Sequence, residues 1–130
     1  MSDPSDAYLD KARQSLREAR AVAGIGFYAA AGRAAYLAAF HAAQAFILFR
    51  TSKIAKTHAG VRSEFARITK DESGLERDLA SFLARAYNLK TVADYAVGAD
   101  VGVGASEATE AIDGATRFVD SIERVLSEKR

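Results

Sequence analysis

Only two histidines and no cysteine occur in the 130 residues, so acid–base chemistry would depend on few side chains. His41 shares an apolar stretch with Arg33, and Arg62 follows His58 after four residues. An imidazole transfers protons near neutral pH, and a guanidinium grips phosphate oxygens through two donors at once. Because the chain lacks cysteine and histidine–carboxylate motifs such as HExxH, we expect neither thiol chemistry nor a metal site.

Helix geometry sets the relation between Arg33 and His41. Their offset of eight residues turns a helix by about 800°, which leaves the side chains about 80° apart and about 12 Å apart along the axis. The two can meet only through the long reach of arginine or across a dimer. The alternative is that His41 is a core residue and Arg33 lies near a helix end. A buried arginine is costly unless a partner balances its charge.

Charge is distributed unevenly along the chain. The formal net charge is +1, which is unlike a wholly basic nucleic-acid binder or an acidic disordered tail. Residues 50–70 nevertheless carry one acid, Glu64, and six cations: Arg50, Lys53, Lys56, Arg62, Arg67 and Lys70. Such a basic edge beside aromatic residues suits the phosphates of RNA or a nucleotide. The alternative is a solvated helix face.

Helices are the elements that must position these residues. Apolar residues recur at helical spacing over residues 4–24, 27–50, 58–70 and 75–97, and again from about 106 to the C-terminus. Connections between these segments are short, which favours antiparallel neighbours. The sequence predicts an all-α protein, an up-and-down four-helix bundle with one additional short helix, in a single domain covering residues 1–130.

The stretch 27–49 is long enough to span a membrane. It contains Arg33, His41 and Gln44, however, and much of it is alanine, which is barely hydrophobic. We therefore expect the central buried helix of a bundle rather than a membrane span. The polar, acidic N-terminus and the absence of cysteine lead us to expect a cytoplasmic protein.

Three blocks of the sequence are residues 31–45, AGRAAYLAAFHAAQA, residues 56–65, KTHAGVRSEF, and residues 85–95, RAYNLKTVADY. Together they resemble small stand-alone bacterial HEPN domain proteins. The first block resembles that family's R-A-Y-Y-A-x-F-H-A-A helix. The second resembles its K-T-H-x-G-V-x-x-x-F segment, and the third resembles its R-x-x-A-D-Y segment. The blocks follow the family order and cover the second to fourth predicted helices.

The resemblance implies a helical bundle that usually dimerises. In many HEPN domains an arginine and a histidine separated by four to six residues form a metal-independent ribonuclease site. Such domains often act as toxins paired with a minimal nucleotidyltransferase antitoxin. In this chain seven residues separate Arg33 from His41, and Lys90 stands where the family often has arginine. Other branches bind nucleotides or a partner without catalysis.

For a ribonuclease, the resemblance implies that His41 transfers the proton and Arg33 clamps the phosphate. Cleavage through the ribose 2′-OH would make RNA the substrate. Tyr36 and Asp94 would orient His41 or the RNA. No cofactor is expected.

His58 and Arg62 are a second candidate pair, because an offset of four places them on one helix face. Lys90 and Tyr95 complete the group that we expect to bind or orient RNA phosphates. The alternative for His58 is a polar residue at a helix N-terminus. The alternative for Asp94 and Tyr95 is that they satisfy buried donors between helices.

Two main hypotheses follow. The first is a ribonuclease toxin of a toxin–antitoxin pair, and the second is a non-catalytic module that binds a nucleotide or docks a nucleotidyltransferase. A third, weaker option is a dimerisation scaffold. The partners we expect are a second copy of the chain, a nucleotidyltransferase antitoxin, and RNA or a nucleotide, without a membrane.

Overall fold

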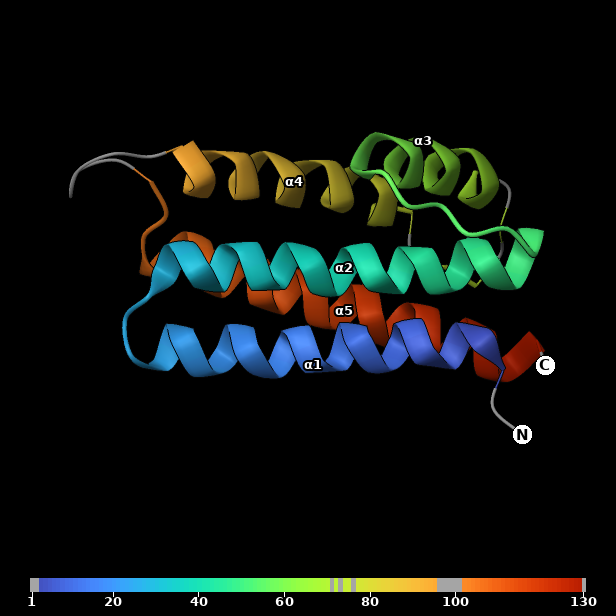
Figure 1. Cartoon of the computed structure of the whole chain (residues 1–130), viewed down its shortest axis with the longest axis horizontal. Coiled ribbons are helices and arrows are strands. Elements are labelled where there is room, and N and C mark those ends of the chain that lie inside the picture. Colours follow the sequence, from blue (N-terminus) through green and yellow to red (C-terminus); the bar gives the residue numbers. More distant parts are fainter. Residues whose placement is uncertain (1–2, 71, 73, 76, 96–101, 130) are drawn as a thin grey trace.

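Four long helices and one short helix make up the fold in a computed structural model, which describes residues 3–70, 72, 74–75, 77–95 and 102–129. The helices are α1 (Pro4–Gly24), α2 (Tyr28–Thr51), α3 (His58–Thr69), α4 (Leu79–Tyr95) and α5 (Ala105–Lys129). Helices α1, α2, α4 and α5 alternate in direction, and no strand occurs in the part of the chain described (Figure 1). The predicted all-α up-and-down bundle with one additional short helix is confirmed.

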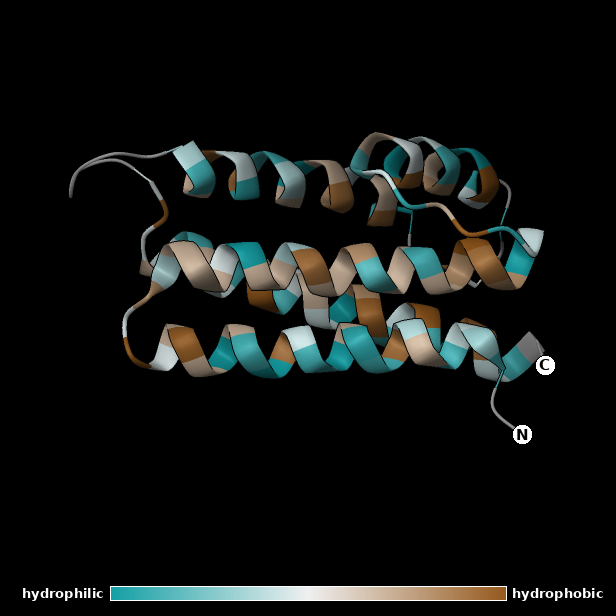
Figure 2. Cartoon of the chain, in the orientation of Figure 1, coloured by the Kyte–Doolittle hydropathy of each residue, from teal (hydrophilic) through white to brown (hydrophobic). Residues whose placement is uncertain are grey.

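Helix α2 is the centre of the bundle. It packs against the other four helices, with α1 and α5 on one side and α3 and α4 on the other (Figure 1). Apolar residues are frequent along α2 (Figure 2), and its buried positions are mainly alanine. Small side chains let neighbouring helices approach closely, whereas Phe46 and Phe65 fill the wider space between α2, α3 and α5.

Local signals fix the first helix. The Asp3 carboxylate accepts from the Ser5 backbone N–H at 2.8 Å, and the Asp6 carboxylate accepts from the Asp3 N–H at 3.2 Å. Pro4 fills the first helical position, where no backbone donor is needed. Gly26 follows the helix with φ 86°, a conformation that glycine adopts without strain. The predicted start at Asp3–Pro4 and end near Gly24 are confirmed.

The fourth helix begins later than the sequence pattern predicts. Leu75 precedes it in a turn after Gly74, whose φ is 98°, and α4 starts only at Leu79. Leu75 still packs against the core. Its apolar side chain therefore indicates contact with the core and not a helical conformation. The expected end at Val97 and the loop over 98–101 lie outside the described residues. In residues 102–104 the chain is not helical, as expected.

No helix among the described residues is both long enough and apolar enough to cross a membrane. For 27–49 this agrees with the expectation of a buried bundle helix.

Candidate functional site

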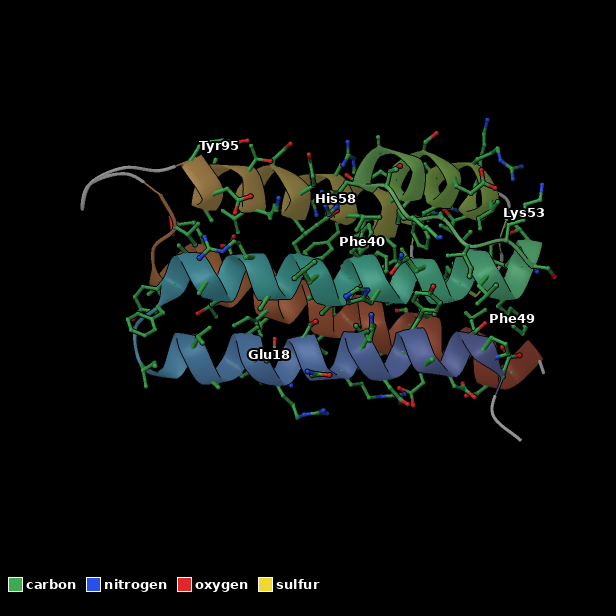
Figure 3. The ribbon with its side chains drawn as sticks, in the orientation of Figure 1. Glu18, Phe40, Phe49, Lys53, His58 and Tyr95 are labelled. Carbon is green, nitrogen blue, oxygen red and sulfur yellow. The ribbon has the colours of Figure 1, made fainter. Side chains whose placement is uncertain are left out.

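Side chains from α2, α3 and α4 meet in one cluster of Tyr36, His58, Arg62 and Tyr87, called here the Tyr–His–Arg cluster. The Tyr36 hydroxyl lies 2.7 Å from His58 Nδ1. The Tyr87 ring lies 5.4 Å from that of Tyr36 and 5.6 Å from that of His58, between ring centres. The Arg62 guanidinium carbon lies 3.9 Å from the centre of the Tyr87 ring, within cation–π distance. Figure 3 shows His58 on the side of α2 that carries α3 and α4.

The start of α3 positions the two basic residues of this cluster. Thr57 caps the helix, and its hydroxyl accepts from the Gly60 N–H at 2.9 Å. A Cβ at position 60 would lie 2.6 Å from that hydroxyl oxygen, so glycine leaves room for the cap. His58 is therefore the first residue of α3, and Arg62 follows one turn later. Both contact Tyr87.

Burial and neighbouring charge set the protonation of the cluster. Burial raises the pKa of Tyr36 to about 12, although the Arg62 charge opposes this rise. Burial, followed by the charges of Lys90 and Arg62, lowers the pKa of His58, and Asp94 acts in the opposite direction. His58 is thus neutral at pH 7. The positive charge of Arg62 near the Tyr36 oxygen favours the arrangement in which the Tyr36 O–H donates to Nδ1 and the His58 proton resides on Nε2.

Positive charge exceeds negative charge around the Tyr–His–Arg cluster. Arg62 Nη1 is buried and has no hydrogen-bond partner within the described part of the chain. Lys90 and Arg33 share one carboxylate, that of Asp94, at 2.6 and 3.8 Å, and Arg33 also donates to the Ala93 carbonyl at 3.2 Å. Three cations therefore face one acid among these residues. The arrangement suits phosphate oxygens.

His41 has different surroundings. Its Nδ1 lies 2.8 Å from Gln44 Oε1, and its ring lies 5.5 Å from that of Phe40, which in turn lies 4.9 Å from His58. Burial lowers the pKa of His41, the Gln44 hydrogen bond raises it, and the Lys11 charge of α1 lowers it further. The Phe40 ring thus contacts both imidazoles, and Figure 3 shows Phe40 and His58 close together.

The structure groups most of the predicted site residues. It brings Tyr36, His58 and Arg62 together, and it joins Arg33, Lys90 and Asp94 at the end of α4. The interactions recorded among described residues hold Arg33 to α4 and His41 to Gln44, and none joins Arg33 to His41 within one chain. Tyr95 is 79% exposed. Figure 3 shows this last residue of α4 at the end of the helix.

Sequence reasoning did not assign roles to Tyr87, Phe40 and Gln44. Tyr87 lies one turn before Lys90, inside the block 85–95, so its place beside a basic residue could have been found there. Gln44 lies one turn after His41 and could have been identified as its partner in the same way. The sequence gives no sign that Phe40 contacts both histidines, because an aromatic residue next to a histidine is common in protein cores.

A separate groove of about 440 Å³ lies between α4 and α5. Phe82 and Leu89 contribute apolar surface, and charges of both signs line it, including Arg85, Glu110 and Arg117. Among the described residues, no three side chains of the histidine, aspartate or glutamate type gather where they could hold a metal ion.

Comparison with known proteins identifies the family of the chain. The family model of the HEPN domain matches residues 5–125. A protein of Methanocaldococcus jannaschii, named a "putative toxin", is 31% identical over 122 residues, which cover 94% of this chain and 88% of that protein. The crystal structure of TT1696 from Thermus thermophilus has a TM-score of 0.75 and 27% identity, covering 95% of this chain and 98% of that one.

Proposed function

The chain belongs to the HEPN domain family, and we propose that it is a toxin that cleaves RNA without a metal ion. One observation carries the proposal: the Phe40 ring contacts the imidazoles of His41 and His58, and the charges of Lys90 and Arg62 act on that of His58. The name of the Methanocaldococcus relative supports a toxin. Proton transfer and phosphate binding are the two capacities that metal-independent RNA cleavage needs.

In the proposed reaction His41 is the proton-transfer residue. Its Nε2 takes the proton of a ribose 2′-OH, and the 2′-oxygen attacks phosphorus. The bond from phosphorus to the 5′-oxygen breaks, and the imidazolium of His41 returns the proton to that oxygen. The products are a 2′,3′-cyclic phosphate and a 5′-hydroxyl.

The cations hold the phosphate in this proposal. Arg62, Lys90 and Arg33 contact its non-bridging oxygens, where negative charge grows in the transition state. His58 donates from Nε2, and Tyr36 holds His58 in that tautomer. Asp94 orients Lys90 and Arg33, and Tyr95 offers an exposed ring on which a base can stack.

Cleavage of a defined RNA tests this function. The purified protein is incubated in EDTA with an oligoribonucleotide, and with a matched strand carrying 2′-deoxyribose throughout. We expect cleavage of the first strand only, products ending in cyclic phosphate, and loss of cleavage in His41→Ala. Intact RNA with the wild-type protein, together with unimpaired growth of cells that express it without a partner, would overturn the proposal.

A non-catalytic docking module is the second candidate, and the groove between α4 and α5 favours it. Under this proposal the chain forms a homodimer and binds a nucleotidyltransferase antitoxin or a nucleotide. The complex, or a nucleotide-dependent rise in melting temperature, would then be equal in the wild type and His41→Ala. Under the first proposal an antitoxin of that class would suppress cleavage of cytoplasmic RNA.

A further inference from the structure

We propose that Gln44 is a positioning residue that holds His41 in the tautomer with its proton on Nδ1, which leaves Nε2 to accept the substrate proton. The inference deepens the proposed function and rests on it for the role of Nε2. The tautomer itself can be measured without any activity.

The orientation of the Gln44 amide follows from its second partner. Gln44 is 7% exposed, and its Nε2 donates to the backbone carbonyl of Ala55 at 2.9 Å. A carbonyl oxygen only accepts hydrogen bonds, so the NH₂ group must face Ala55. The amide oxygen therefore faces His41, whose Nδ1 lies 2.8 Å away.

The tautomer of His41 follows from the amide orientation. Gln44 Oε1 can only accept, so the nearby Nδ1 must carry a proton. In a neutral imidazole the other nitrogen then holds the lone pair. Burial and the charge of Lys11, on the adjacent α1, keep the pKa of His41 below its ordinary value, so the neutral form prevails at pH 7. Within the described residues, no hydrogen bond engages Nε2 of His41.

Two substitutions of similar volume separate positioning from simple packing. Gln44→Met removes both hydrogen bonds of the side chain, whereas Gln44→Glu keeps an oxygen that accepts from Nδ1–H. The readout is the pair of ¹⁵N chemical shifts of the His41 imidazole, which distinguish the tautomers directly. We expect Nδ1–H in the wild type and in Gln44→Glu, and a shift toward Nε2–H in Gln44→Met.

RNA cleavage is the second readout. In Gln44→Met we expect kcat/KM to fall roughly 10- to 100-fold, the loss seen when the orienting partner of a metal-bound imidazole is removed. In Gln44→Glu we expect activity to persist with the pKa of His41 raised, because the carboxylate stabilises the imidazolium. Its pH–rate profile should therefore move to higher pH.

Thr69→Val provides the matched control. Thr69 is the last residue of α3 and donates to the Phe65 carbonyl at 2.6 Å, so the variant removes a hydrogen bond without touching His41 or Gln44. We expect unchanged ¹⁵N shifts there. An Nε2–H tautomer in the wild type, or Nδ1–H in Gln44→Met, would overturn the inference. Correct tautomers in a protein that leaves RNA intact would contradict only the proposed function.

Discussion

The Tyr36 hydroxyl and His58 Nδ1 lie 2.7 Å apart and join the central helix α2 to the first residue of α3. Tyr36 is 0% exposed, so water does not reach its hydroxyl. Tyr36→Phe would remove the partner of Nδ1 on the half-buried His58. We expect the free energy of unfolding to fall by roughly 0.5–1.5 kcal/mol, the net contribution of a typical intramolecular hydrogen bond. Urea denaturation measures this free energy.

Tyr28→Phe is the matched control for Tyr36→Phe. Tyr28 is the first residue of the same helix and is only partly buried. Its hydroxyl should contribute little, so the free energy of unfolding should change by less than about 0.5 kcal/mol. Equal losses of free energy of unfolding in the two variants would show that the Tyr36–His58 hydrogen bond does not stabilise the fold more than an ordinary surface hydroxyl does.

Stability should fall as pH decreases through the histidine range. The pKa values of His41 and His58 are lowered by burial from their ordinary value of 6.5, so the unfolded chain binds these protons more readily. The contribution of the two histidines to the free energy of unfolding is complete above the ordinary pKa. It is lost as the pH falls toward the lower pKa of the folded state. Urea denaturation at about pH 7.5 and about pH 5.5 should give a lower free energy of unfolding at the lower pH.

The double variant His41→Gln/His58→Gln should flatten this pH dependence. The lowered pKa of Glu64 starts from an ordinary value of 4.5, so that carboxylate titrates below the window measured. A dependence as steep in the double variant as in the wild type would assign the effect to other groups.

Gly114→Ala should be strongly destabilising. A Cβ there would meet the Phe82 ring, with Cδ1 and Cζ each at 2.8 Å, closer than real carbon contacts. We expect a loss of about 1–3 kcal/mol in the free energy of unfolding, the usual cost of overpacking. Partial recovery in Gly114→Ala/Phe82→Leu would assign the loss to that contact, and a stable single variant would refute it.

Gly24→Ala is the comparison for Gly114→Ala. Nothing lies within 4 Å of a Cβ at Gly24, the last residue of α1. Alanine favours the helix over glycine by up to about 1 kcal/mol, so we expect a neutral or stabilising change. Thermal unfolding of both variants measures the contrast.

Asp94→Asn should strengthen RNA binding. Asp94 is the carboxylate that Lys90 and Arg33 share, so its neutralisation frees two cations for phosphates. Fluorescence anisotropy with a short RNA at several salt concentrations should show tighter binding. The plot of log affinity against log salt should also steepen by about 0.7 for each additional phosphate that the protein neutralises.

Asp10→Asn removes the same charge elsewhere and controls for net charge. Asp10 pairs with Arg13 on α1 at 3.4 Å. We expect a smaller gain in affinity and an unchanged slope. The same slope in the wild type and in Asp94→Asn would show that Lys90 and Arg33 do not reach RNA.

The sequence predicts the helices well because each leaves a local signal. The Asp3 cap, the glycines around the end of α1 and the helical spacing of apolar residues are properties of residues close in the sequence. Leu75 is the exception, since an apolar residue can be buried in a turn as well as in a helix.

The site is harder to predict because it depends on contacts between helices. His58 and Arg62 can be paired from their offset of four, but their shared contact with Tyr87 depends on how α3 lies against α4. Arg33 and His41 share one helix, yet Asp94 on α4 and the nearby Gln44 determine where each side chain lies. The pairing of Arg33 with His41 across a dimer stays a prediction.

The two hydrogen bonds of the Gln44 amide also connect His41 to the segment that leads to His58. Its oxygen holds His41, and its nitrogen holds the carbonyl of Ala55, three residues ahead of His58. The segment from Ser52 to Thr57 is therefore a common support, tied to α2 by the same side chain that orients His41. An insertion or deletion in this segment would therefore displace the imidazoles of His41 and His58 together.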